Sequence, residues 1–146
     1  MAHYRDAVTN YDLLNLGDFE FQCGVVLTDT KLAYRTYGEL NPEGSNAILI
    51  AVPVNGTHQD AASIHIDGEN RAISPERHFV IIPDMFGNGL SSSPSNTPSP
   101  FDGVDFPSVT IYDNVRAQHR LVTGELGISK LKLVTGFSMG GLQSFH

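Results

Sequence analysis

The chain has 146 residues, with 16 acidic against 9 basic side chains and a formal net charge of −7. A chain of this length is long enough for one domain, which buries about two-thirds of the surface of its unfolded chain. The acidic balance and the lack of a Lys or Arg cluster argue against nucleic acid or an anionic membrane as the main partner. No stretch approaches the roughly 18 apolar residues of a membrane span, and the N-terminus lacks an apolar signal core, so we expect a soluble cytoplasmic protein.

The sequence contains one cysteine, Cys23. A single thiol rules out an internal disulfide framework and a cysteine-based structural zinc site, which suits a reducing compartment. We expect Cys23 to be buried as a small hydrophobic side chain.

The N-terminal part of the chain predicts a hairpin. Residues 1–18 are weakly patterned, and we expect them to form an irregular leader. Residues 19–27 and 32–40 are extended runs joined by a polar connection at residues 28–31, which has the length of a hairpin turn. These two runs are expected to pair as antiparallel strands.

Two apolar runs, residues 47–52 and 78–83, predict strands that are buried on both faces of a sheet. The segment of about 25 residues between them is long enough for a helical crossover, so we expect these strands to be parallel. Residues 90–107 are rich in Ser, Pro, Asn and Gly. Because this composition cannot supply a packed core, we expect a long loop on the surface.

A helix is predicted to begin at Thr110, because Asp113 three residues later completes a start that resembles a capping box. Gly127 is predicted to end this helix. Gly124 costs about 1 kcal/mol relative to alanine, so we expect the last turn to be irregular. The residues expected near one apolar face are Ile111, Val115, Val122 and Leu126.

The last stretch carries the strongest chemical signal. Residues 131–135 predict a short buried strand, residues 136–140 match the pattern G-x-S-x-G, and residues from Leu142 onward can open a helix. A serine presented for attack must sit in a strained strand-to-helix turn that is flanked by small residues. The sequence therefore predicts a nucleophile elbow at Ser138. The order of elements indicates an α/β fold whose parallel sheet is entered through an antiparallel hairpin.

A serine nucleophile needs donors for the oxyanion that forms on its substrate. In an elbow the first donor is the backbone N–H of the residue after the nucleophile, here Met139. The second donor comes from the loop after the third strand, which is residues 53–58, and we expect it to be the N–H of Val54. The alternative is that Asn55 and Gly56 only mark a turn.

The base and the carboxylate that orients it cannot be assigned. The partners of such a serine follow it in the chain, yet eight residues come after Ser138. We expect His146 to point along or away from the last helix, while His58, near the proposed oxyanion loop, is an alternative base. The other histidines are expected to be surface or packing residues: His3, His65, His78 and His119.

Other site motifs in the sequence are incomplete. The triplets at residues 58–60 and 65–67 contain His and Asp without a known ligand spacing, so no metal site is predicted. Residues 87–89, Gly-Asn-Gly, follow a strand as a dinucleotide loop would, but residue 92 is Ser and the pattern G-x-G-x-x-G fails.

Several stretches together resemble the homoserine O-acetyltransferase family of α/β-hydrolases, namely residues 32–41, 55–58, 83–96, 110–118 and 136–143. The resemblance implies that Ser138 accepts an acyl group and that the N–H groups of Val54 and Met139 occupy the oxyanion positions. In transferases of this type the acyl group passes from acetyl-CoA, the possible co-substrate here, to serine and then to an alcohol. In hydrolases water takes it. No permanently bound cofactor is expected, and the partners are a small-molecule acyl donor and acceptor.

The resemblance covers the N-terminal half of the family, which continues past the elbow with further strands, a lid and the remaining triad residues. We therefore expect residues 1–146 to be the N-terminal portion of a single α/β-hydrolase-like domain, incomplete after the elbow and inactive alone. Its full-length form would perform serine-dependent acyl transfer or ester hydrolysis. The alternative is a non-enzymatic remnant that acts as an interaction or scaffold module. A sheet that ends at the elbow strand exposes an apolar edge, so we expect a homodimer or a complementing C-terminal half.

Overall fold

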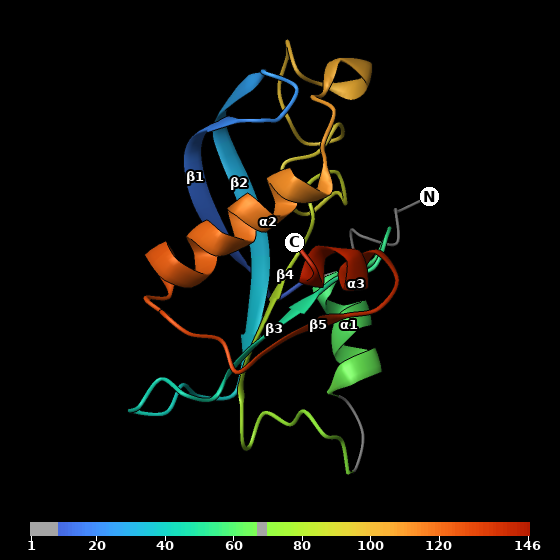
Figure 1. The fold of residues 1–146 in the computed structure, drawn as a ribbon. Coiled ribbons are helices and arrows are strands. Elements are labelled where there is room, and N and C mark those ends of the chain that lie inside the picture. The colour runs from blue at the N-terminus through green and yellow to red at the C-terminus, as the bar shows by residue number, and fades with distance from the viewer. Residues whose placement is uncertain (1–8, 67–69) are drawn as a thin grey trace.

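A computed structural model describes residues 9–66 and 70–146 of the protein (Figure 1). The described strands form a five-stranded sheet in the order β1-β2-β4-β3-β5. Their bounds are Asp12–Glu20 (β1), Val26–Tyr37 (β2), Ala47–Ala51 (β3), Phe79–Pro83 (β4) and Leu133–Gly136 (β5). The helices are His58–His65 (α1), Ile111–Arg120 (α2) and Met139–Ser144 (α3), with short helical turns at Gly103–Asp105 and Leu121–Glu125.

The N-terminal hairpin is present, but its turn lies earlier than predicted. β1 pairs antiparallel with β2, and the chain reverses within residues 21–25. Gly24 adopts a positive φ of 85° there, and its N–H donates to the carbonyl of Phe21. Gly24 can take this conformation without steric cost, and this sets the position of the turn. Residues 28–31, where the turn was predicted, are part of β2. Cys23 lies in the turn and is exposed, so the prediction that it is buried is wrong.

Strand β1 begins inside the segment predicted to be an irregular leader. That prediction is wrong for residues 12–18, which belong to β1, and Leu16 and Phe19 bury their side chains in the core. Gly17 has a positive φ of 64° at a shift in the strand register, which interrupts the alternation that marks a strand in sequence. Residues 1–8, which include His3, lie outside the described residues.

Strands β3, β4 and β5 form the parallel part of the sheet, as predicted. β3 pairs parallel with both β4 and β5, and all of its residues are buried, which confirms the prediction of a strand buried on both faces. α1 forms the crossover from β3 to β4. The predicted α/β fold, with parallel strands entered through an antiparallel hairpin, is thus confirmed.

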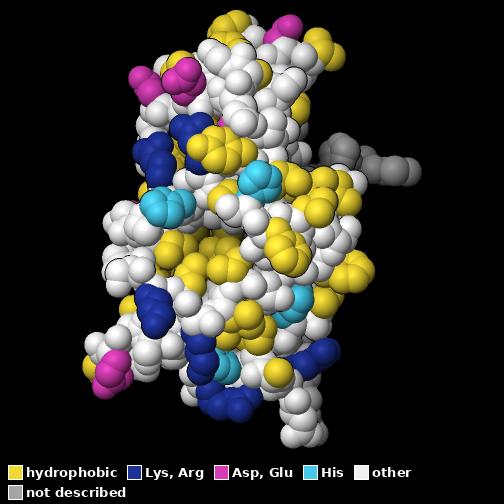
Figure 2. Space-filling view, viewed as in Figure 1, with side chains coloured by type: hydrophobic (Ala, Val, Ile, Leu, Met, Phe, Trp, Pro, Cys, Tyr) yellow, Lys and Arg dark blue, Asp and Glu magenta, His cyan; other side chains and the backbone are white. Residues whose placement is uncertain are grey.

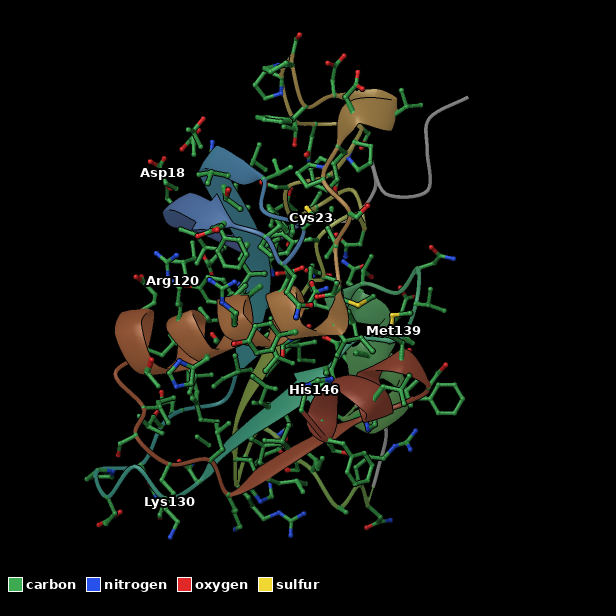
Figure 3. All side chains as sticks on the ribbon, turned by 45° about the horizontal axis from the view of Figure 1, so that its top comes forward. Asp18, Cys23, Arg120, Lys130, Met139 and His146 are labelled. Atoms are coloured by element: carbon green, nitrogen blue, oxygen red, sulfur yellow. The ribbon has the colours of Figure 1, made fainter. Side chains whose placement is uncertain are left out.

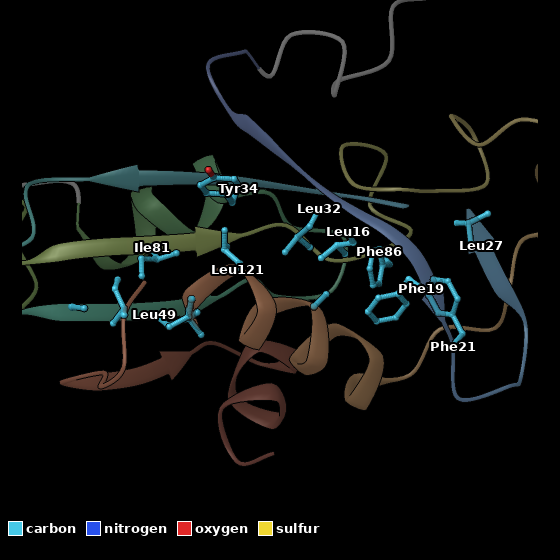
Figure 4. Packing of buried hydrophobic residues seen from close by; sticks show 14 residues of the cluster. Leu16, Phe19, Phe21, Leu27, Leu32, Tyr34, Leu49, Ile81, Phe86 and Leu121 are labelled. Carbon is cyan, nitrogen blue, oxygen red and sulfur yellow. The ribbon is translucent and has the colours of Figure 1, made fainter. Parts of the chain in front are cut away.

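Alternate residues of the central strands face two separate cores, because successive side chains of a strand point to opposite faces. On one face the strands pack against α1 through Ile48, Ile50, Val80, Ile82 and Ala62. On the other face they pack against α2 and a group of aromatic rings through Leu49, Ile81, Leu121, Phe19, Phe21 and Phe86 (Figure 4). The sheet is therefore covered on both faces, and the carboxyl ends of β3, β4 and β5 meet at one edge.

Helix α2 begins as predicted. Thr110 is its N-cap, and the side chains of Thr110 and Asp113 form a capping box. The helix ends irregularly, as predicted, because Leu121–Glu125 forms a π-helical turn that contains Gly124. Gly127 follows with a positive φ of 63°.

The buried face of α2 differs from the predicted one. Asp113, Asn114, Ala117 and Gln118 are buried, whereas Ile111 and Val115 are only partly buried. The polar residues are buried because they bond to distant backbone groups: Asp113 accepts from the N–H of Gln22, and Asn114 from that of Phe86, both at 2.9 Å.

Residues 90–107 form a long loop, but its first part is not on the surface. Ser91 is buried, with its hydroxyl accepting from the N–H of Ala33 and donating to the carbonyl of Asp84, both at 2.9 Å. The Ser91 hydroxyl thus accepts from a backbone N–H of β2 that a neighbouring strand would otherwise bind. The expectation of an exposed loop is wrong for residues 90–93, because polar composition does not show where a hydroxyl finds partners.

Strand β5 lies at one edge of the sheet, as predicted, but Leu133 and Val134 are 42% and 39% exposed. The prediction of a buried strand at residues 131–135 is therefore wrong, because β5 pairs on one side only, with β3, among the described strands. Beside it, an apolar hollow of about 190 Å³ opens between α2, β5 and α3, and Figure 2 shows hydrophobic side chains gathered on this face. Its apolar lining includes Leu49, Val115, Val122, Leu131 and Val134. Across residues 9–66 and 70–146, no helix is long and apolar enough to cross a bilayer.

Candidate active site

Ser138 stands in a turn between a strand and a helix. β5 ends at Gly136 and α3 begins at Met139. The backbone of Ser138 has φ 56° and ψ −120°, a region that residues other than glycine rarely adopt, and its side chain is exposed. This is the backbone arrangement that a nucleophile elbow requires, so the predicted strand, turn and helix are confirmed.

Gly136 and Gly140 allow the turn to lie close to the end of β3. A Cβ atom at Gly140 would lie 2.2 Å from the carbonyl oxygen of Ala51, and one at Gly136 would lie 2.4 Å from the carbonyl carbon of Gly140. Both neighbours are backbone atoms, which cannot yield without moving an element. The glycines therefore let α3 pack directly on the carboxyl end of β3.

Residues 52–57 join β3 to α1 and contain most of the loop, residues 53–58, that was predicted to bear an oxyanion donor; His58 belongs to α1 instead. Asn55 has a positive φ of 58°, and the N–H of Gly56 donates to the carbonyl of Pro53 at 3.0 Å, so the turn exists. Within the described part of the chain, neither the N–H of Val54 nor that of Met139 makes a hydrogen bond. Both residues line the same cavity, of about 220 Å³. Two such donors beside one cavity can stabilise an oxyanion, and their assignment to that role stays a prediction.

The cavity is walled by segments from distant parts of the chain. Its apolar lining residues include Met85, Phe86, Val109, Ile111 and Met139. Asn114 holds two of these segments together, since its Oδ1 accepts from the N–H of Phe86 at 2.9 Å and its Nδ2 donates to the carbonyl of Thr110 at 3.0 Å. The cavity can therefore take a small, mostly apolar group.

The carboxylate of Asp84 anchors the far end of the 52–57 loop. It accepts from the backbone N–H of His58 at 2.9 Å, pairs with the His58 Nδ1 at 2.7 Å, and accepts from the Asn88 amide at 3.0 Å. Asn88 also donates to the carbonyl of Gly56 at 3.2 Å. These contacts tie the loop after β3 to the loop after β4.

His58 is held inside the molecule. It is 1% exposed, its ring centroid lies 5.9 Å from that of Tyr11, and its Nε2 has no hydrogen-bond partner among the described residues. Asp84 is fully buried beside it. The pair has the chemistry of a histidine oriented by a carboxylate, but no hydrogen bond joins it to Ser138 in the described structure.

The other histidines do not meet Ser138 either. Figure 3 shows Met139 and His146 at opposite ends of α3, and His146 is exposed with its ring centroid 6.5 Å from that of Tyr112. His78 is buried and its Nδ1 accepts from the N–H of Ser74 at 3.3 Å. Among residues 9–66 and 70–146, Ser138 has no histidine within hydrogen-bonding distance.

The two His-containing triplets have separate local roles. Asp60 completes the capping box at the start of α1, and His65 lies in its last turn. Burial, with a smaller contribution from the charge of Arg71, lowers the pKa of His65 below its ordinary value of 6.5. Asp67 lies outside the described residues. The described residues contain no group of three or more His, Cys, Asp or Glu side chains that could hold a metal ion.

Four buried polar residues at the site were missed in the sequence: Asp84, Asn88, Gln118 and Gln143. Asp84 had a usable signal, because it follows the apolar run of β4 and polar groups at the carboxyl ends of parallel strands gather at one edge. Gln118 and Gln143 had no such signal in the sequence. Their amides bond to each other at 2.6 Å across 25 residues, and no local pattern marks such a pair.

Known proteins are similar to this chain in sequence and in fold. The family model described as the alpha/beta hydrolase fold matches residues 60–146. The chain belongs to the α/β-hydrolase fold family. Its resemblance to the homoserine O-acetyltransferases is also confirmed, since several of them match over most of the chain, together with esterases of the same fold.

Three of these α/β-hydrolase relatives show the extent of the likeness. The ethyl acetate hydrolase of Pseudomonas veronii is 41% identical over 136 residues, which cover 93% of this chain and 39% of that protein. A homoserine O-acetyltransferase of Rhodopseudomonas palustris (strain BisB18) is 39% identical over 139 residues, covering 85% of this chain and 34% of that protein. The solved structure of the acetyl esterase MekB is 39% identical, with a TM-score of 0.91, over 97% of this chain and 41% of that one. This α/β-hydrolase chain thus spans about two fifths of the length of these relatives.

Proposed function

We propose that Ser138 is the nucleophile of a serine-dependent ester hydrolysis or acyl transfer. The observation that carries the proposal is the pair of N–H groups on Val54 and Met139. Neither N–H group has a partner among the described residues, and the residues Val54 and Met139 line one cavity. Ser138, which directly precedes Met139 in the chain, stands in a strained turn. Donors fixed in advance around a site of developing negative charge are a large source of catalysis in acyl transfer.

In the proposed reaction, Ser138 Oγ attacks the carbonyl carbon of the acyl donor while a base takes its proton. The carbonyl oxygen becomes an oxyanion that accepts from Val54 and Met139. The C–O bond to the leaving alcohol, or the C–S bond to a leaving thiol, then breaks while the base returns the proton to the leaving oxygen or sulfur, and an acyl group remains on Ser138. Water or an acceptor alcohol attacks this acyl group and restores the serine.

The base in this proposal comes from outside residues 9–66 and 70–146, because no histidine there meets Ser138. A histidine oriented by a carboxylate is the usual solution. The matched region covers 39% of the Pseudomonas veronii relative, and we propose that polypeptide of that kind supplies the histidine, so that the chain by itself is inactive.

We propose acetyl esters of small alcohols as the substrates. The cavity of about 220 Å³ suits a small acyl or alcohol group, and two relatives are an ethyl acetate hydrolase and an acetyl esterase. The second candidate is acetyl transfer from acetyl-CoA to homoserine, which the matching homoserine O-acetyltransferases favour. In that case acetyl-CoA is a co-substrate and not a resident cofactor.

The proposal is tested by joining the chain to the segment of the Pseudomonas veronii hydrolase that follows the matched region. The fusion is expected to hydrolyse p-nitrophenyl acetate, and Ser138→Ala is expected to abolish this activity. Supplying acetyl-CoA and homoserine to the same fusion separates transferase from hydrolase. A folded fusion as inactive as its Ser138→Ala variant would favour a non-enzymatic interaction or scaffold module.

A further inference from the structure

The two proposed oxyanion donors lie on different elements. Val54 belongs to the loop after β3, whereas Met139 is the first residue of α3. An oxyanion hole works only when both N–H groups lie about 2.7–3.1 Å from the same oxygen position. Contacts between the 52–57 loop and α3 must therefore set their spacing.

Gln143 bridges these two elements. Its Nε2 donates to the carbonyl of Val52 at 3.1 Å and also contacts the sulfur of Met85 at 3.2 Å. Gln143 lies on α3 four residues after Met139, and Val52 lies two residues before Val54. One side chain thus joins the helix that bears one donor to the segment that bears the other.

Gln118 on α2 bonds to the other end of the Gln143 amide. Its Nε2 donates to Gln143 Oε1 at 2.6 Å, while the Gln143 NH₂ group donates separately to the carbonyl of Val52. The two side chains are 5% and 3% exposed, so water does not compete for these bonds. In such surroundings each hydrogen bond is electrostatically stronger than it would be in water.

Helix α3 depends on contacts of this kind. It has six residues, too few to be stable alone, and Gly140 already places it against the carbonyl of Ala51. Contact at Gly140 fixes how close the helix lies, but not how far it is rotated about that contact. The Gln143 bond to Val52 supplies this second constraint.

We propose that Gln143 is a positioning residue, which holds the N–H groups of Val54 and Met139 at the spacing an oxyanion requires. This inference rests on the proposed function. It assigns Gln143 no contact with the substrate, since its effect passes through Val52 and α3.

The test compares Gln143→Met with Gln118→Met in the chain itself. Both changes replace a buried glutamine of one hydrogen-bonded pair by a side chain of similar length, but only Gln143→Met removes the bond to Val52. Two readouts are used: the rate at which a fluorophosphonate labels Ser138 in the presence of imidazole, and the ¹H–¹⁵N amide signals of Val54 and Met139.

Gln143→Met is expected to slow labelling by about tenfold or more and to shift both amide signals, as expected for a displaced oxyanion donor. Gln118→Met is expected to change the rate by less than about threefold, with both signals near their wild-type positions, although both variants lose stability. Equal effects of the two variants on both readouts would mean that Gln143 only stabilises the fold and would overturn the inference. Unchanged amide signals in Gln143→Met would overturn it as well. If wild-type Ser138 does not react at all, the proposed function fails, while the amide signals still decide whether Gln143 positions the two elements.

Discussion

The Nδ1 of His58 lies 2.7 Å from the Oδ2 of Asp84, and neither side chain is more than 1% exposed. The same carboxylate accepts from the backbone N–H of His58 and from the amide of Asn88. A buried carboxylate is tolerated only when it accepts hydrogen bonds. The bonds made by Asp84 therefore connect the loop that follows β3 to the loop that follows β4.

Replacement of Asp84 by alanine should destabilise the protein by about 3–5 kcal/mol, because it leaves the donors of His58 and Asn88 buried without an acceptor. Urea unfolding followed by circular dichroism measures the loss. Asp12→Ala is the matched control, because Asp12 is exposed and lies 4.0 Å from Arg35. It should cost less than about 1 kcal/mol. Similar losses in both variants would contradict the role given to Asp84.

Replacement of Gly140 by alanine should cost about 1–3 kcal/mol, since the added Cβ would lie 2.2 Å from the backbone oxygen of Ala51. Gly124 provides the comparison. A Cβ there meets nothing within 4 Å, and its φ is not positive, so Gly124→Ala should be neutral or stabilising by up to about 1 kcal/mol. The thermal unfolding midpoints of the two variants measure these changes in stability. An unchanged midpoint in Gly140→Ala would show that α3 does not pack closely on the end of β3.

The lowered pKa of His65 predicts a pH dependence of stability. Burial, and to a lesser extent Arg71, disfavour the protonated form in the folded state, while the unfolded chain binds a proton near the ordinary pKa of 6.5. The unfolded state therefore takes up more protons below that pH, and stability should fall as the pH drops from about 7.5 to 5.5. His65→Gln should show a smaller fall in its urea midpoint over this range. The same fall in both proteins would contradict the prediction.

The exposed edge at β5 predicts self-association. Leu133 and Val134 are partly exposed on an edge strand beside an apolar hollow, and such edges pair readily with other chains. Light scattering should show a dimer or larger species for the wild type and a shift toward monomer for Leu133→Lys. A monomeric wild type at tens of micromolar would be evidence against this use of the edge.

Much of the fold could be predicted because its signals are local. The apolar runs of β3 and β4, the capping box at Thr110 and the strand-to-helix turn at Ser138 each depend on residues close in sequence. The hairpin turn was misplaced because Gly24, one residue with a positive φ, outweighed the polar composition of residues 28–31.

The polar groups that hold the candidate site could not be predicted in this way. Ser91 pairs with Ala33 across 58 residues, and Gln118 pairs with Gln143 across 25. Asp84 reaches His58 across 26 residues. Such partners are brought together by the sheet topology and not by any repeating pattern, so only the three-dimensional arrangement identifies them.

We propose that Ser138 and the N–H groups of Val54 and Met139 are already arranged for acyl chemistry, while no histidine of residues 9–66 and 70–146 reaches Ser138 as a base. Imidazole added to the chain can take the proton of Ser138 while its oxygen displaces fluoride from a fluorophosphonate, and mass spectrometry of the labelled peptide measures the rate. Imidazole should speed labelling of Ser138 by about tenfold or more, with no labelling of nearby Ser144. Labelling that imidazole does not change, or that falls equally on Ser144, would contradict the account.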